Sequence, residues 1–303
     1  MNWVAEDYLL GVLAAILSGV VWNFGMVLQK KIVNDLWLKD PTGNRNIHLY
    51  KNPIWLLGVF LSLIIATIFF LWAQQMIGPA LVPGLMSAGF IVLIIGSVKI
   101  IKVKLNFQEL VGIGLVMLGI ILLGFSELEI NVQAINFNDQ SFFLRAGIFS
   151  LILFGLWIGF FFSVHYVKKR KGIFKALSSA LPLCISDFWI CIAIATVTKF
   201  IAGETLPTFE VFLLLFSIVI VIGANIQNIR ETQIAFRFAD ASIVIPIQQI
   251  PIQISPIFIY YLVFAMASPK VTSFLFILLG TSIIIGSGFL LSQRQANKEL
   301  HSM

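Results

Sequence analysis

Residues 107–125, FQELVGIGLVMLGIILLGF, decide the class of this protein. The segment has one charged residue, Glu109, near its start, and a helix of about 20 apolar residues crosses the hydrocarbon core of a bilayer. Other apolar segments of similar length lie along the chain, bounded by charged residues, Gly and Pro. They are residues 8–28, 54–74, 80–98, 142–166, 177–200, 210–230, 241–265 and 272–292. The sequence therefore predicts an all-α polytopic membrane protein with nine transmembrane helices.

The composition excludes most soluble classes of protein. Of the 303 residues, 59% are hydrophobic and 11% are charged, whereas soluble domains carry about 25% charged residues. A soluble fold of this size could not cover its surface with so few charges, which excludes a soluble enzyme, a nucleic-acid-binding protein and a disordered chain. The sequence contains no P-loop, GxGxxG, GxSxG, HExxH or CxxC motif. We therefore expect no enzyme activity, no cofactor and no nucleic-acid partner, and any active transport would draw on an ion gradient.

The basic residues predict how the chain is oriented. Lys and Arg concentrate in the cytoplasmic segments of membrane proteins. Here 17 of the 20 fall in alternate connections or at their edges, in those that follow the first, third, fifth, seventh and ninth apolar segments. This alternation predicts a plasma-membrane protein with its N-terminus outside and its C-terminus in the cytoplasm. We attribute the bases to topology and to lipid headgroup contact rather than to an acidic ligand. The connections on the other side of the membrane carry a net negative charge. We attribute this charge to solvation of that surface, although an acidic face could also gather cations.

An internal repeat relates the two parts of the chain. Residues 74–126 resemble residues 233–292, since in both an apolar segment runs into a proline, Pro83 or Pro246. The glycine of a Leu-Gly pair follows 36 residues after the first proline and 34 residues after the second. The first copy begins in the second span and the second copy in the seventh, so the copies have opposite orientations in the membrane. Inverted repeats are characteristic of secondary transporters, whose substrate site lies near the midplane between the copies.

We accordingly predict two transmembrane halves. Residues 1–126 form the N-terminal half with spans one to four, residues 127–141 an outer loop, residues 142–292 the C-terminal half with spans five to nine, and residues 293–303 a cytoplasmic tail. Small residues four apart, Gly155 with Gly159 and Ala15 with Gly19, predict close helix packing. Trp55 lies near the end of a predicted span and is expected to anchor at the membrane interface.

Four segments carry a resemblance to a known family. They are Phe24–Lys31 (FGMVLQKK), Gly78–Gly89 (GPALVPGLMSAG), Lys104–Gly124 (KLNFQELVGIGLVMLGIILLG) and Asp240–Pro246 (DASIVIP). With these segments the chain resembles the drug/metabolite transporter superfamily, is EamA-like, and is nearest to the nine-span branch of NIPA-type magnesium transporters. The resemblance implies a secondary transporter that moves a small solute or ion by alternating access.

The chain departs from the magnesium branch at two places. Where that branch tends to have Glu in the second span, this sequence has Ile68, and where it tends to have an Asn-Lys pair, this sequence has Gln233-Ile234. These differences count against magnesium as the substrate, and the excess of amides over acids within the spans favours a neutral or zwitterionic small solute. Magnesium remains the alternative, because amides and carbonyls can hold a partly hydrated ion. A non-transporting membrane scaffold or receptor is a further alternative, although it explains an acid inside a span poorly.

Asp187 is the only acid well inside a predicted span. At 1.5 Å per residue it lies roughly 16 Å deep, where a charged group costs about 2.5–3.5 kcal/mol on insertion scales. Because hydrocarbon disfavours the charged form of a carboxyl, we expect Asp187 to act as a proton-relay group or a cation ligand. The structural alternative is a neutral carboxyl that bonds to a neighbouring helix.

Amide side chains form the larger polar set within the spans. Interhelical hydrogen bonds could explain each of them singly, but their concentration in the first, second, seventh and eighth spans favours a polar cavity. The predicted substrate or ion site comprises Asp187, Asn23, Gln74, Gln75, Asn225, Asn228, Gln248, Gln249 and Gln253.

Prolines recur every five residues in the eighth span, where each removes an N–H from the helix. The predicted helix breaks or gating points are Pro83, Pro246, Pro251 and Pro256, with a simple packing kink as the alternative. We predict no dedicated metal-ligand set. The expected partners are a small-molecule or ion substrate and the lipid bilayer, with a homodimer left open.

Overall fold

The computed structural model describes residues 5–39, 49–77, 81–128, 139–166, 170–203 and 205–301. Within these ranges all regular secondary structure is helical, and nine helical segments are long and apolar enough to cross a membrane. They are Tyr8–Leu36, Pro53–Ile77, Val82–Lys99, Phe107–Gly124, Gln140–Val164, Lys171–Ile201, Thr208–Phe238, Ala241–Val263 and Val271–Gln295. Each predicted span overlaps one of these segments, which confirms, for the described residues, the all-helical class and nine helices long and apolar enough to cross a membrane.

Most spans are single helices, and three contain a change of helix type. The second span consists of α3 (Pro53–Phe60), the π-helix η1 (Leu61–Ile65) and α4 (Ala66–Ile77), and the third of α5 (Val82–Met86), the 3-10 helix η2 (Ser87–Gly89) and α6 (Phe90–Lys99). In the eighth span α11 (Ala241–Phe258) continues into the π-helix η4 (Ile259–Val263). The remaining spans are α1 (Ala5–Lys39), α7 (Phe107–Gly124), α8 (Gln140–Tyr166), α9 (Lys171–Ile201), α10 (Thr208–Phe238) and α12 (Val271–His301).

Side-chain caps explain where two of the spans begin. Asn52 accepts hydrogen bonds from the N–H groups of Ile54 and Trp55 at 3.0 and 3.1 Å, and Pro53 fills the first helical position of α3, where no N–H is needed. At the start of α7 the Asn106 side chain accepts a hydrogen bond from the N–H of Phe107 at 2.6 Å. Both caps satisfy backbone donors that would otherwise be unpaired at a helix start.

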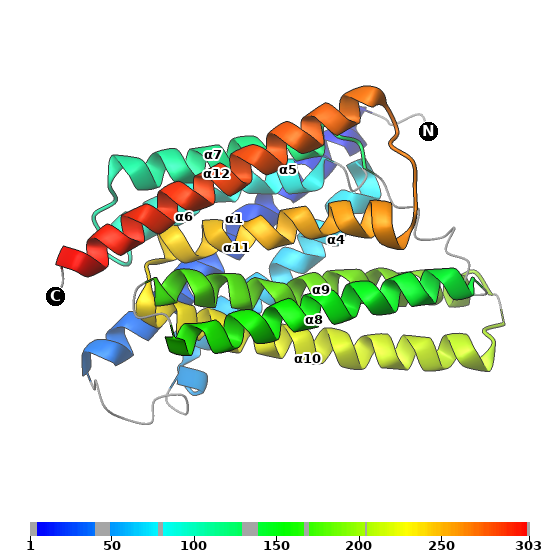
Figure 1. Cartoon of the computed structure of the whole chain (residues 1–303), viewed down its shortest axis with the longest axis horizontal. Coiled ribbons are helices and arrows are strands. Elements are labelled where there is room, and N and C mark those ends of the chain that lie inside the picture. Colours follow the sequence, from blue (N-terminus) through cyan, green and yellow to red (C-terminus); the bar gives the residue numbers. More distant parts are fainter. Residues whose placement is uncertain are drawn as a thin grey trace.

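The long helices run side by side, and the start of α1 and the end of α12 lie at opposite ends of the bundle (Figure 1). The α6–α7 connection and the start of α9 lie at the same end as the end of α12. We call this the basic end, because it carries residues such as Lys99 and Lys171. The opposite end, with Glu127 and Asp139, is called the acidic end. The structure thus gathers the described parts of the basic connections at one end, and the cytoplasmic location of that end stays a prediction.

Two helices extend beyond their predicted spans. α1 continues to Lys39, so Lys30, which we expected in a connection, is only 4% exposed inside the bundle. α12 continues to His301, so residues 293–301 extend the helix of the ninth span, and their cytoplasmic location stays a prediction. Both extensions lack Gly and Pro and are rich in residues that favour helix. Most of the predicted outer loop, residues 129–138, lies outside the described part of the chain.

The helices pack in two groups that share a core. α1 packs against the elements of the second and third spans, whereas α9 packs against α8, α10 and α11. α7 and α12 lie along each other, and α11 contacts helices of both groups. One buried cluster therefore joins Val27 and Phe90 to Phe236 and Ile243, while a second cluster around Phe188 is confined to the C-terminal half.

Close helix packing occurs at one of the two predicted small-residue pairs. A Cβ atom added at Gly19 would lie 2.0 Å from the carbonyl oxygen of Met86, and Ala15, one turn earlier on α1, is fully buried. The prediction is therefore confirmed for α1. For Gly155 and Gly159 of α8 it is wrong within the described chain, because no atom lies within 4 Å of a Cβ built at either position.

Candidate functional site

Asp187 lies halfway along α9 and is exposed. The residues next to it in sequence turn toward other helices. The Phe188 ring contacts the Phe149 ring of α8 at 5.5 Å, and Ser186 accepts a hydrogen bond from Asn225 of α10 at 2.7 Å. The Asp187 carboxyl makes no hydrogen bond or ion pair with any residue that the structure describes. The structural alternative, a carboxyl bonded to a neighbouring helix, is therefore not observed.

The face of α9 that carries Asp187 is the one its neighbours leave uncovered. Ile194 and Val197, two and three turns later, are 38% and 39% exposed. Cys191, one turn after Asp187, is half-buried, and its thiol donates to the Asp187 backbone carbonyl. A carboxyl that is exposed midway along a transmembrane helix faces either lipid or a water-filled space, and lipid cannot solvate it.

Three predicted amides meet where α9, α10 and α11 converge. Gln248 is 2% exposed, and its amide nitrogen donates to Ser179 Oγ at 2.6 Å and to Thr232 Oγ1 at 2.7 Å. Asn228 donates to the carbonyl of Ser179 at 2.7 Å. Asn225 lies about one turn earlier on α10, where it bonds to Ser186. The sequence identified these amides, but it gave no sign that Ser179 and Thr232 are their partners.

Not all of the predicted site residues join this group. Gln253 donates to Gln249 at 3.0 Å, so this pair bonds along α11 itself. Asn23 bonds back to Gly19 of its own helix, and its buried carbonyl oxygen has no partner among the described residues. Gln74 and Gln75 lie near the end of α4 at the acidic end, and Gln75 is exposed. The residues that were predicted to line one cavity therefore lie at several separate places in the structure.

The prolines do not break α11. The helix runs without interruption past Pro246, Pro251 and Pro256, and the change to a π-helix comes after them, at Ile259–Val263. Each proline still leaves the carbonyl four residues before it without its usual helical partner. Pro83 lies in the first turn of α5, where a missing N–H leaves no bond unmade. The expected helix break is thus replaced by a continuous helix with free carbonyls.

A chain of hydrogen bonds that we did not predict joins the two halves near the basic end. Gln29 donates to Ser62 Oγ of the second span at 3.0 Å, and its own amide oxygen accepts a bond from Gln233 of α10 at 2.6 Å. Trp55 Nε1 donates to Gln233 at 3.1 Å. Trp55 is 4% exposed, so its predicted role as an interfacial anchor is wrong.

Buried charged residues make further contacts between helices at the basic end. Lys30 donates to the backbone carbonyls of Phe236 and Ala239, where α10 ends and its carbonyls lack helical partners. Glu109, fully buried at the start of α7, accepts bonds from Arg294 Nε and from Ser242 Oγ, both at 3.1 Å.

A buried ion pair lies beside this chain of bonds. Lys175 of α9 and Glu231 of α10 pair at 2.6 Å with little exposure of either side chain. We refer to Gln29, Lys30, Trp55, Ser62 and Gln233, with the pairs Lys175–Glu231 and Glu109–Arg294, as the basic-end polar layer.

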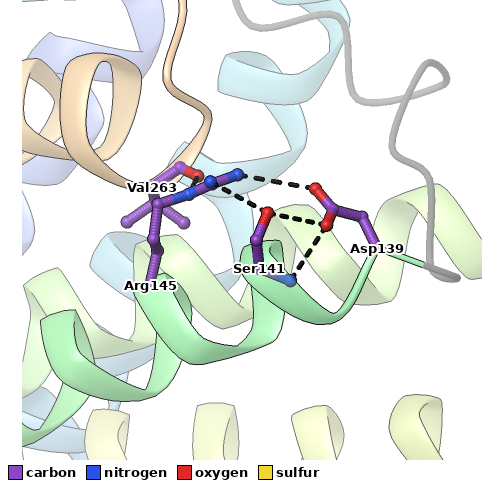
Figure 2. A network of polar contacts seen from close by, with 4 residues as sticks. All are labelled: Asp139, Ser141, Arg145 and Val263. Atoms are coloured by element: carbon purple, nitrogen blue, oxygen red, sulfur yellow. Dashed lines mark hydrogen bonds and ion pairs between the residues drawn. The ribbon is translucent and has the colours of Figure 1, made fainter.

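A smaller network lies at the acidic end (Figure 2). Asp139 accepts bonds from the hydroxyl and the N–H of Ser141 at 2.7 and 2.9 Å, and the hydroxyl bond chiefly holds the pKa of Asp139 below its usual 3.8. Arg145 Nε donates to the carbonyl of Val263 at 2.9 Å. Because Val263 ends η4, this bond fixes the end of the eighth span to the start of α8.

Within the described ranges, no three or more His, Cys, Asp or Glu side chains gather where they could hold a metal ion. Cys184 is buried and Cys191 half-buried, and neither forms a disulfide bond. Comparison with protein-family models, with curated proteins and with solved structures finds no match.

Proposed function

We propose that this protein is a secondary transporter that moves a small neutral or zwitterionic solute by alternating access. The observation that carries the proposal is Asp187, an acid exposed midway along a transmembrane helix without a partner among the described residues. A carboxyl in lipid would cost about 2.5–3.5 kcal/mol, so the exposed face of α9 is better explained as the wall of a wet cavity. Asn225 of α10 bonds to Ser186, the residue before Asp187, whereas Asn228 and Gln248 bond to Ser179, two turns earlier on α9. Amides of this kind can supply neutral donors and acceptors for a solute when the helices rearrange.

The order of helix packing supports two repeats of the drug/metabolite transporter type. α1 packs against the two spans that follow it, and α9 packs against α10 and α11 in the same way. The last helices of the two sets, α7 and α12, pack against each other. This order is what two copies of opposite orientation, related by an axis in the membrane plane, would give, with α8 as an additional helix.

The basic-end polar layer serves as the gate of this transporter. Gln29 and Trp55 on the N-terminal side bond to Gln233 on the C-terminal side, so the halves cannot separate at this end unless those bonds break. With this end toward the cytoplasm, as the basic residues predict, the described conformation is closed inside. The alternate conformation would exchange these bonds for water or for other partners.

The proposed cavity predicts that position 187 can be labelled. In a variant with Cys184→Ala and Cys191→Ala, Asp187→Cys should react with a membrane-impermeant maleimide added to intact cells. Water in the cavity brings the reagent to the thiol and allows its ionisation. Labelling is measured as an increase in the apparent mass of the protein on gels.

The matched control is Leu151→Cys. Leu151 is 71% exposed on α8, which packs against α9 and η4 at the edge of the bundle. A thiol at this lipid-facing position should not react. Equal labelling at both positions, or none at position 187, contradicts the cavity and favours a non-transporting scaffold.

Coupling to protons gives a second prediction. A thermal-shift screen of small solutes against the purified protein identifies a solute to use as the transport probe. Asp187→Asn should abolish the pH-dependent uptake of this probe while leaving the folding of the protein intact. The amide keeps the shape of the side chain but cannot exchange a proton. Asp139→Asn is the control, since this carboxyl lies outside the spans. Uptake by the Asp139→Asn variant should match uptake by the original protein. Unchanged pH dependence in Asp187→Asn contradicts the coupling role.

Magnesium is the second candidate substrate, and α11 provides the observation that favours it. Three prolines within one helix free backbone carbonyls, which are suitable ligands for a hydrated cation. Growth rescue of a magnesium-import-deficient cell tests this candidate. Failure to rescue, with membrane insertion confirmed, favours an organic solute.

A further inference from the structure

A groove of about 590 Å³ lies at the connection between α6 and α7, at the basic end. Five apolar side chains line it, among them Val98 and Leu110, together with Lys102 and Lys104. Its lining includes neither Asp187 nor any residue of the basic-end polar layer. Nothing in the proposed transport cycle uses it.

The lysines around this groove differ from the cations that are paired elsewhere in the described part of the chain. Lys99, Lys102 and Lys104 are exposed, and none of them makes an ion pair or a side-chain hydrogen bond with the described residues. By contrast, Lys175 and Lys270 are each paired with a carboxylate. Three cations within six residues, none paired with a described carboxylate, create a local positive potential that favours an anionic ligand.

The backbone holds this connection in a defined shape. Lys102 has a left-handed conformation, with φ at +63°, which is uncommon for a residue with a Cβ. Hydrogen bonds on either side fix it, from Ile101 N to the carbonyl of Gly96 and from Val103 N to the carbonyl of Ser97. The lysines are therefore presented from a fixed turn rather than from an open loop.

The apolar part of the groove continues along the membrane-facing side of α6. Ile91, Ile95 and Val98, at successive turns, are 54%, 49% and 48% exposed. They form an apolar track that leads from the lysines toward the middle of the bilayer. A ligand that matches both parts has an anionic head and a hydrocarbon tail.

We propose that the groove binds an anionic glycerophospholipid, with its phosphate between Lys99, Lys102 and Lys104 and an acyl chain along Ile91, Ile95 and Val98. The proposal rests on the predicted orientation, since the cytoplasmic leaflet is the one rich in anionic lipids. It doesn't depend on which solute the protein transports. The bound lipid would hold the α6–α7 connection at the membrane surface.

Native mass spectrometry of the full-length protein tests this site. The protein is incubated with phosphatidylglycerol or with phosphatidylcholine of the same acyl chains, and bound lipid is counted. The original protein should retain phosphatidylglycerol preferentially. A triple variant, Lys99→Gln with Lys102→Gln and Lys104→Gln, should lose affinity for it by on the order of 100-fold, because each lysine near an anionic lipid contributes about a fivefold factor.

The control removes the same charge elsewhere at the basic end, through Lys31→Gln, Lys171→Gln and Arg230→Gln. This variant should retain phosphatidylglycerol, and an equal loss in both triple variants overturns the proposal in favour of general charge attraction. Val98→Trp keeps the lysines and fills the groove at an exposed position, so it should also weaken lipid retention. Inorganic phosphate should not compete at millimolar concentration, and competition would identify a soluble-anion site instead.

Discussion

Replacing Lys175 by Met should lower the free energy of unfolding by about 3–5 kcal/mol. The Lys175 ammonium lies 2.6 Å from a Glu231 oxygen and 4.6 Å from the centre of the Phe161 ring. Glu231 is fully buried, so its carboxylate would lose its only cationic partner in the described chain without gaining water. The remaining bond from Gln227, at 3.2 Å, cannot compensate for a full charge.

Denaturant titration in detergent micelles measures this loss, and two further variants interpret it. The double variant Lys175→Met with Glu231→Gln should regain most of the stability, because a neutral pair leaves no buried charge. Lys270→Met removes an exposed pair with Glu127, where the side chains are 60% and 53% exposed, and should cost less than about 1 kcal/mol. If Lys175→Met costs no more than Lys270→Met, water reaches the pair and the basic end is not closed.

The fold was predictable because the membrane imposes a simple rule on the sequence. Each span needs about 20 apolar residues, and the charges between the runs mark the helix ends. The prediction failed where a charged residue finds partners inside the protein. Lys30 was assigned to a connection by its charge, yet the carbonyls at the end of α10 solvate it within the bundle.

The candidate site was predictable only in part, for a related reason. Asp187 stands out in the sequence because no other acid lies so far from a span end. The partners of Gln248 do not stand out, since Ser179 and Thr232 are common residues that lie 69 and 16 positions away. Pairing across helices depends on how each helix is rotated, and apolar runs of nearly uniform hydrophobicity give little indication of rotation.

The charged pairs were missed because their members lie near span ends. Glu109 and Arg294 are 185 positions apart, and each resembles an ordinary residue at the membrane surface. In the fold both lie at the basic end, where α7 and α12 pack together. A single sequence contains no signal that pairs them, so the basic-end polar layer becomes visible only in three dimensions.

Gly89→Ala should lower the free energy of unfolding. Overpacking costs about 1–3 kcal/mol, and the expected loss lies near the upper end of that range. A Cβ atom at this position would lie 2.1 Å from the carbonyl oxygen of Gly19 and 2.7 Å from the Asn23 amide nitrogen. The first obstacle is backbone, which can give way only if α1 and η2 move apart. Because Asn23 must move as well, uptake of a transported probe should fall together with stability.

Gly147→Ala provides the matched control for this contact. Gly147 also lies in a transmembrane helix, but no atom is within 4 Å of a Cβ built there. The substitution should therefore raise stability by about 0.5–1 kcal/mol through helix propensity alone. Thermal unfolding in the same micelles compares the two variants directly. A loss of stability for Gly89→Ala together with a gain for Gly147→Ala is expected only if α1 and η2 are in backbone contact. A gain in stability for both variants would show that this contact is not tight.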